Sequence, residues 1–293
     1  MEPSEAISRL RVAFGGPDGY RTLHAKGRFY AGSFTATPEA AALCRAGHLD
    51  GTPRPVLVRW STGSGNGRTK DPSPDIRGMA VKFAGDDGRP FDLLGQTSTS
   101  FPTQDPEEFV RIAEASRNQL TFPLFLLRHP QLLPAFVRGI SGVKSHHSFA
   151  EAAFYPLHAY GWLDAEGRRT WVRHEFRPTA TREDRLAETF TGRDRLAEEV
   201  AARLATGPVV HEVWVQLAEE RHDPDDVTTA WKGARTLLAG RIEVTAEADD
   251  PEAGGSPTVF DPTRTVDGIE LSNDPILLYR RGAYTESVSR RTR

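Results

Sequence analysis

The chain has 293 residues, of which 38% are hydrophobic and 9% aromatic, so it can bury a substantial core in one large domain or two smaller ones. Its 37 basic and 40 acidic residues give a net charge of −3, which excludes a general electrostatic attraction to nucleic acid or to an anionic membrane. Any cationic site must therefore be local.

Neither end of the chain nor its interior carries a targeting or membrane signal. Residues 1–16 have acidic side chains where a secretory signal peptide needs basic ones, and they lack its apolar core. The apolar stretch at residues 121–137 is interrupted by Arg128, His129 and three prolines, so it is a poor membrane span. These features predict a cytoplasmic protein with no membrane partner. Cys44 is the only cysteine, which excludes an intrachain disulfide, and its helix-like neighbours predict a plain buried thiol.

The first part of the chain alternates between helical and strand patterns without a regular βα repeat. Helical periodicity, in two cases after a Thr-Pro or Asp-Pro start signal, predicts helices at residues 4–14, 37–47 and 105–118. Short β-branched or aromatic runs bounded by Gly, Pro or Asp predict strands at residues 26–37, 54–62, 77–85 and 89–95.

The rest of the chain continues in the same way. Residues 159–176 are typical of a hairpin, with residues 164–167 as its turn. Strands are predicted at 157–167, 168–178, 209–219 and 240–248, and helices at 181–205, 223–240 and 272–291. About eight strands clustered around helical insertions predict an α+β fold with a largely antiparallel sheet or closed barrel. Residues 247–257 are interpreted as a surface loop.

Several familiar motifs fail on detail. The glycine-rich residues 61–70 suggest a phosphate loop, but Arg68 stands where a Walker motif needs lysine and no helix start follows. No histidine pair has the spacing of a zinc helix, and His146 with His147 is predicted to form a solvated turn. No G-x-S-x-G motif supplies a hydrolase nucleophile.

Two segments are better candidates for a site. His24 closes a loop just before a predicted strand, where it is either a general base or a structural histidine. Arg59 and Ser61 are two residues apart on another predicted strand, so a cation and a hydroxyl point to the same face.

The C-terminal helical pattern offers a third candidate. Arg280 and Tyr284 are four residues apart and share a helix face, with Arg291 a further seven residues along it. The segment is either an amphipathic basic helix or a metal site. In the second case Arg280 lowers the phenol pKa of Tyr284, normally about 10, so that a phenolate can bind ferric iron while Arg291 holds a carboxylate. Spacing alone leaves both interpretations open.

In this order, four segments together resemble the heme catalase family: RxxHAKG at residues 21–27, VRWST at 58–62, DIRGMAVKF at 75–83 and RxxxY at 280–284. The likeness runs from Arg21 to Arg291. It implies a single catalase-like heme-binding domain over residues 1–293, with an antiparallel β-barrel of about eight strands, surrounding helices, and heme between them. Without the long N-terminal arm and C-terminal helical domain of full-length catalases, the chain resembles the short catalase-related peroxidases.

The resemblance assigns residues to the distal side of the heme. His24 would be the acid–base residue, Ser61 would orient it, Phe109 would line this side and Leu23 would narrow the peroxide approach. Gln96 stands where the family has an asparagine that helps to orient peroxide. The extra methylene moves the amide, which disfavours disproportionation of peroxide.

The resemblance also assigns the proximal side and the heme edge. Tyr284 would be the axial ligand of the iron, and Arg280, supported by Asp274 and His158, would hold it as a phenolate. The heme propionates would pair with Arg21, Arg59 and Arg291, because arginine suits charge-assisted bidentate contacts.

The implied function is a heme b (ferric protoporphyrin IX) peroxidase that reduces hydrogen peroxide or organic hydroperoxides with a small organic electron donor and keeps weak catalase activity. His24 would take a proton from the near peroxide oxygen and return it to the far one. The alternatives are a true small-subunit catalase, a fatty-acid hydroperoxide isomerase or dehydratase of the allene oxide synthase type, and a heme sensor or carrier without turnover. The sequence leaves homo-oligomerisation open and indicates no nucleic-acid partner.

Overall fold

The computed structural model describes residues 1–16, 20–85, 88–118, 120–252 and 256–291. Its strands are β1 (Gly27–Ala36), β2 (Arg54–Thr62), β3 (Arg77–Phe83), β4 (Phe91–Gln96), β5 (Ala159–Leu163), β6 (Arg169–Pro178), β7 (Val209–Leu217), β8 (Arg235–Glu247) and β9 (Ile269–Leu271). Its α-helices are α1 (Pro3–Phe14), α2 (Pro38–Leu43), α3 (Pro106–Ala115), α4 (Phe122–Arg128), α5 (Leu133–Gly139), α6 (Arg195–Leu204) and α7 (Pro275–Ser289). Three short 3-10 helices are η1 (Gly47–Leu49), η2 (Pro130–Leu132) and η3 (Ile140–Gly142).

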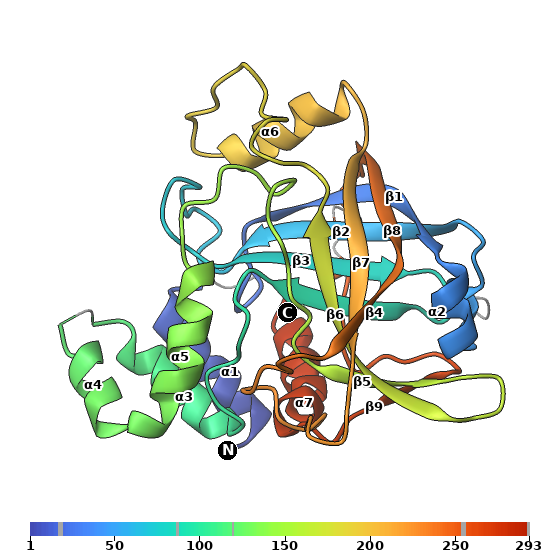
Figure 1. The fold of residues 1–293 in the computed structure, drawn as a ribbon. Helices are drawn as coiled ribbons and strands as arrows, with labels where there is room; N and C mark the ends of the chain where they lie inside the picture. Colours follow the sequence, from blue (N-terminus) through green and yellow to red (C-terminus); the bar gives the residue numbers. More distant parts are fainter. Residues whose placement is uncertain (17–19, 86–87, 119, 253–255, 292–293) are drawn as a thin grey trace.

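The strands form one antiparallel sheet in the order β4-β3-β2-β1-β8-β7-β6-β5-β9. The sheet curls on itself into a half-barrel (Figure 1). Two isolated bridges, Gln96 with Tyr155 and Phe154 with Phe176, connect the β4 side to β6 through the segment between them. The prediction of an α+β fold with an antiparallel, barrel-like sheet is therefore confirmed, with the short β9 added to the expected eight strands.

The inside of the curled sheet is a core of large aromatic side chains. Every second residue of β7 is buried, as expected for a strand with one face on a core. Phe34 packs edge-on against Phe83 at 5.1 Å between ring centroids, and Phe91 packs edge-on against Tyr160 at 5.6 Å. Full burial of each such side chain stabilises the fold by roughly 1.5–3 kcal/mol.

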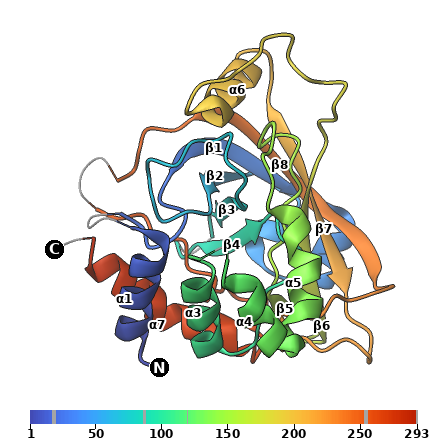
Figure 2. The same cartoon turned by 90° about the vertical axis from the view of Figure 1, so that its left-hand side faces the viewer.

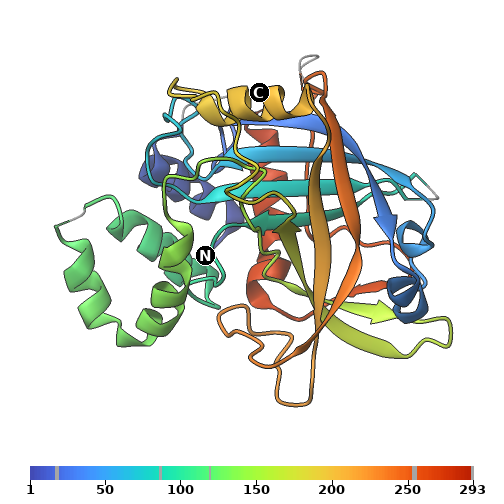
Figure 3. The same cartoon turned by 45° about the horizontal axis from the view of Figure 1, so that its top comes forward.

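The helices lie at the rim of the sheet, and most of them are on one side of it (Figures 2 and 3). The buried side chains of α1 and α3, among them Leu10 and Val110, pack together and against Tyr279 of α7. Arg9 of α1 donates two hydrogen bonds to Glu114 of α3, at 2.7 and 2.6 Å. Figure 2 shows α1, α7, α3 and α4 in a row beneath the sheet, whereas Figure 3 shows α4 and α5 standing away from it and α6 lying along the opposite rim. None of the helices in the described ranges is long and apolar enough to cross a bilayer.

Most predicted elements lie where they were expected. The helices predicted at residues 4–14, 105–118 and 272–291 are α1, α3 and α7, and the predicted hairpin is formed by β5 and β6. The predicted helix at 37–47 is limited to the six residues of α2. Cys44 is buried, with 1% of its surface exposed, and burial raises the pKa of its thiol to about 11, so the prediction of a plain buried thiol is confirmed.

The helix predicted for residues 181–205 is wrong over its first part, because only residues 195–204 are helical. In the preceding segment, the backbone N–H and the hydroxyl of Thr181 both donate to the Asp184 carboxylate, at 2.7 and 2.9 Å. Such local side-chain hydrogen bonds compete with helix formation. Gly192 disfavours helix at the other end of this segment.

The helix predicted for residues 223–240 is also wrong. The backbone N–H and hydroxyl of Thr228 donate to Asp226 in a turn, at 2.8 and 2.6 Å, and the chain from Arg235 onward forms β8. Pairing of β8 with β7 satisfies the backbone of these residues, and this long-range partner is invisible to a local helical pattern.

Local sequence patterns did not predict β9, α4 and α5, and the prediction for one histidine is wrong. His146 is buried, not solvated, and its Nε2 lies 3.2 Å from the carbonyl oxygen of Gly142. His147 is exposed, as predicted.

Candidate active site

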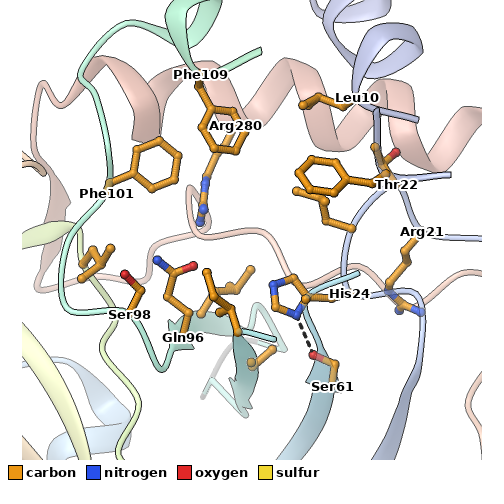
Figure 4. Close-up of a pocket in the computed structure, with 18 of the residues that line it drawn as sticks. Leu10, Arg21, Thr22, His24, Ser61, Gln96, Ser98, Phe101, Phe109 and Arg280 are labelled. Carbon is orange, nitrogen blue, oxygen red and sulfur yellow. Dashed lines mark hydrogen bonds between the residues drawn. The ribbon is translucent and has the colours of Figure 1, made fainter. Parts of the chain in front are cut away.

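A cavity of about 700 Å³ lies between the curled sheet and helices α1, α3, α5 and α7 (Figure 4). All the residues predicted for the site line this cavity except Asp274, which lies behind it at the start of α7. The lining comes from the loop before β1, the ends of β2 and β4, and helices that are far apart in the sequence. The fold therefore brings these predicted residues around one space.

His24 is held in an uncommon backbone conformation on the sheet side of the cavity. Its φ of 54° makes it the only non-glycine residue with positive φ in the described part of the chain. Its backbone N–H donates to the Gly63 carbonyl at 3.0 Å, and its Nδ1 lies 3.0 Å from Ser61 Oγ. When Nδ1 carries the proton and donates to Ser61, Nε2 is left with a free lone pair. Arg59 and Ser61 line the same cavity, as their spacing predicts.

The electrostatics of the cavity keep His24 neutral. Burial, followed by the positive charges of Arg59 and Arg280, lowers the pKa of His24 to about 3. A neutral imidazole can accept a proton, whereas an imidazolium cannot. The surroundings therefore suit His24 to act as a base throughout the neutral pH range.

Gly78 is a site residue that the sequence analysis missed. A Cβ atom at Gly78 would lie 2.7 Å from the His24 ring and 2.8 Å from Ser61 Oγ. Real Cβ atoms do not make such short contacts, so glycine at this point of β3 gives the His24–Ser61 pair its space. The segment RGMAV marks the strand, but nothing in it indicates the approach of His24.

Gln96 and two aromatic side chains line the cavity beside His24. Gln96 ends β4, where its backbone N–H donates to the Tyr155 carbonyl at 3.2 Å, and its amide projects into the cavity (Figure 4). Phe109 of α3 packs on Phe101 with 4.8 Å between ring centroids. Leu23 also lines the cavity. The Gln96 amide, the His24 ring and these apolar side chains thus line the same cavity.

Helix α7 supplies the opposite wall with Arg280 and Tyr284. Burial raises the pKa of the Tyr284 phenol, and the positive charge of Arg280 partly offsets this effect. The expected lowering by Arg280 is therefore present, but within the protein alone burial outweighs it. The Tyr284 hydroxyl forms no hydrogen bond with any part of the chain that the structure describes.

His158 and Asp274 form a buried pair at the start of α7. His158 Nδ1 lies 2.6 Å from Asp274 Oδ2, and the other oxygen of Asp274 accepts the backbone N–H groups of Ile276 and Leu277 at 2.8 and 3.4 Å. Within the described chain Arg280 makes no hydrogen bond to either partner, although its charge, together with burial, lowers the pKa of His158. The support of Arg280 by this pair, which the resemblance implies, therefore stays a prediction.

The three arginines predicted to bind carboxylates lie close together. Two of them share an acidic partner, Glu252, that the sequence did not indicate. Arg21 donates two hydrogen bonds to Glu252, at 2.6 and 2.7 Å, and Arg291 donates a third at 3.1 Å. Glu252 belongs to the loop interpreted only as a surface loop. Burial acts to raise the pKa of Glu252, but the two arginines lower it overall. Arg59 lies beside them, and burial and the charge of Arg21 lower its pKa.

The curled antiparallel sheet and the cavity between a histidine–serine pair and a tyrosine-bearing helix define an α+β protein with a site of the catalase type. The chain belongs to the catalase family, because the family model described as Catalase matches residues 19–293. The fold agrees: a crystal structure of a fungal catalase superposes with a TM-score of 0.78 over 94% of this chain and 60% of that chain, at 21% identity.

Relatives of similar length share more sequence. A catalase-related peroxidase of Mycolicibacterium paratuberculosis is 40% identical over 298 residues, covering 100% of this chain and 95% of the relative. A catalase-related peroxidase of Synechococcus elongatus is 28% identical, covering 100% of this chain and 89% of the relative. The peroxisomal catalase of Candida boidinii is 27% identical, but this chain covers only 57% of it.

The family implies heme, and the residues around the cavity fit that group. The buried Nε atoms of Arg59 and Arg291 have no hydrogen-bond partner within the described chain. Arg21, Arg59 and Arg291 carry three positive charges and Glu252 one negative charge, so the cluster has a net charge of +2. Two carboxylates of one heme would balance this charge. Tyr284 offers an oxygen donor on the opposite wall, a ligand type suited to ferric heme.

Proposed function

We propose that this protein is a heme peroxidase that reduces peroxides with a small organic electron donor and retains weak catalase activity. The observation that carries the proposal is a neutral, Ser61-bound His24 facing the cavity that Tyr284 and Arg280 line from α7. Membership of the catalase family and the names of two full-length relatives support the same conclusion.

In this proposal the cofactor is heme b. Tyr284 would hold its iron, and Arg21, Arg59 and Arg291 would hold its carboxylates. The heme supplies the redox chemistry when it is bound. The phenol of Tyr284 would bind as a phenolate, since a bound cation overrides the raised pKa that burial causes.

The protein's own part in the reaction is proton transfer and orientation. His24 Nε2 would take a proton from the near oxygen of peroxide and deliver it to the far oxygen. Ser61 positions the imidazole through Nδ1. Proton transfer by a positioned side chain typically contributes about 100-fold to 10,000-fold in rate.

Gln96 is the reason to favour a donor-dependent peroxidase over a catalase. Its amide projects into the cavity that His24 also lines (Figure 4). The side chain is one methylene longer than the asparagine of the family pattern, so the amide would lie off the position that suits a second peroxide molecule. Displacements of about 1 Å can cost on the order of 100-fold in rate.

The test uses the heme-loaded protein and two assays, oxygen release from hydrogen peroxide alone and oxidation of an added phenolic donor. We expect donor oxidation to exceed oxygen release, and Gln96→Asn to raise oxygen release. His24→Ala should slow the reaction with peroxide by about 100-fold or more while leaving the amount of bound heme unchanged. Rapid oxygen release without donor oxidation would overturn the peroxidase assignment, and an unchanged rate in His24→Ala would indicate a heme carrier.

A further inference from the structure

The segment that forms α4, η2, α5 and η3 has an unusual surface. Six of the nine large hydrophobic side chains that are exposed in the described residues lie in residues 120–143, which contain these helices, namely Leu120, Leu124, Leu127, Val137, Ile140 and Val143. Their exposed fractions range from 45% for Val143 to 90% for Leu120. Helix α4 buries none of its residues. We call these six side chains the α4–α5 patch.

The segment also differs from the rest of the chain in its charged residues. Residues 115–150 contain no Asp or Glu, although the whole chain has 40, and they include Arg117, Arg128, Arg138 and Lys144. Arg128 and Lys144 are exposed and form no salt bridge within the described part of the chain. The net charge of −3 therefore conceals a local cationic surface around exposed leucines.

Side-chain contacts hold residues 120–143, which we call the lobe, together and attach them to the rest of the protein. Phe122 packs against Phe136 with 5.3 Å between ring centroids, which joins α4 to α5, and Phe125 stacks on His129 at 4.2 Å. Arg138 donates to the Thr228 carbonyl at 2.6 Å and so anchors α5 to the body of the protein. Figures 1 and 3 show the lobe projecting beyond the sheet and the other helices.

We propose that the α4–α5 patch docks on a lipid bilayer that contains anionic headgroups. Exposed Leu side chains flanked by Arg and Lys are the combination that inserts at a bilayer interface, where apolar burial and attraction to anionic lipid act together. Exposed apolar side chains concentrated in one segment of a protein indicate an interaction surface. The lobe lies in the interface and does not span it.

Charge also argues against a second copy of the chain as the occupant. A contact between two copies through this segment would bring together two surfaces on which residues 115–150 carry four basic side chains and no acidic one. An anionic membrane supplies the opposite charge.

The patch and the active-site cavity share two residues. Ile140 and Val143 line the cavity and are also 55% and 45% exposed, so they form its rim. Docking through the patch would therefore hold the cavity rim beside the lipid surface. This inference does not depend on the proposed reaction, because it concerns the outside of the lobe.

The experiment measures co-flotation of the heme-loaded protein with vesicles of phosphatidylcholine alone or of equal parts phosphatidylcholine and phosphatidylglycerol. We expect binding to the anionic vesicles that weakens as salt is added. Leu127→Glu, at a side chain that is 72% exposed, should reduce this binding by about tenfold. The matched control is Val12→Glu on α1, which is 65% exposed and lies outside the patch, and it should bind as the unmodified protein does.

Three outcomes would overturn the proposal: no binding to anionic vesicles, equal loss in the two variants, or a dimer in sedimentation analysis that Leu127→Glu converts to a monomer. The last outcome would identify the patch as an interface between copies. Turnover of hydrogen peroxide in solution by Leu127→Glu should equal that of the unmodified protein, so a failure of membrane docking is distinguishable from a failure of the proposed function.

Discussion

The role proposed for His24 requires its ring to be held in place, and three neighbours contribute to this. Ser61 binds Nδ1, Gly63 binds the backbone N–H, and Gly78 leaves room for the ring. The positive φ of His24 costs on the order of 1 kcal/mol or more, which the surrounding contacts must offset. The imidazole is therefore positioned by its surroundings and not by its own backbone preference.

Replacement of Gly78 tests this positioning. In Gly78→Ala, the new methyl group would displace His24 and Ser61, and we expect the reaction with peroxide to slow by about 10-fold to 100-fold. Gly207→Ala is the matched control, because a Cβ atom there meets nothing within 4 Å. Stopped-flow kinetics of both heme-loaded variants provides the measurement. Equal rates for the two variants would show that His24 tolerates the shift.

Glu252 binds the guanidinium groups of Arg21 and Arg291, which in the proposed function would hold the heme carboxylates. We expect Glu252→Gln to tighten heme binding, on the order of tenfold, because the cluster loses its internal negative charge. Titration of the apoprotein with heme, followed by absorbance, measures this. Asp249→Asn, an exposed carboxylate of the same loop, is the control. Weaker binding in Glu252→Gln would mean that Glu252 positions the arginines instead.

At the level of elements, the N-cap residue of α7, Asp274, links the start of the helix to a buried histidine. Asp274 caps the helix with one carboxylate oxygen and holds His158 with the other. The same helix carries Arg280 and Tyr284, so its position sets one whole wall of the cavity. Because Asp274 makes both contacts, the first turn of α7 is fixed in position relative to His158.

Removal of this cap should destabilise the protein. We expect Asp274→Ala to reduce the free energy of unfolding by about 1–3 kcal/mol, since two backbone N–H groups and His158 lose a buried acceptor. Asp274→Asn can keep the cap but lacks the charge, so its free energy of unfolding should lie between those of the unmodified protein and Asp274→Ala. Urea denaturation of the apoproteins measures the differences. A change below 0.5 kcal/mol in Asp274→Ala, which about equals a typical surface substitution, would contradict this role.

For the molecule as a whole, buried neutral histidines govern stability in acid. Burial lowers the pKa of His48 and His211 to about 4 and that of His174 to about 3. In the unfolded chain these groups titrate near about 6.5. Below that pH the unfolded state binds protons that the folded state does not, so stability falls as the pH decreases from about 6.5 toward 4.

Each such histidine should contribute a loss of up to about 1.4 kcal/mol per pH unit in this window. His174→Phe, within a cluster that includes Phe91, Tyr160 and Trp162, should make the free energy of unfolding less dependent on pH by about one proton. Urea denaturation at several pH values between 4 and 7 provides the measurement. His147→Gln, at an exposed position, should leave the slope unchanged. An unchanged slope in His174→Phe would refute the argument.

Local patterns predicted a large part of this molecule. Short runs of β-branched and aromatic residues identified strands such as β7, and helix start signals identified α3. The spacing of Arg59 with Ser61, and of Arg280 with Tyr284, correctly placed each pair toward one cavity. Residues two apart on a strand or four apart on a helix share a face, whatever the rest of the fold does.

Contacts between distant segments decided the rest. Residues 235–240 became a strand because β7 offered backbone partners, and Glu252 reached Arg21 across 231 residues of sequence. The approach of Gly78 to His24 likewise arises from packing. Short-range periodicity thus determined the faces on which the chemical groups lie. Only the tertiary structure decided which faces meet, because hydrogen-bond and charge partners far apart in the chain outweigh local preference.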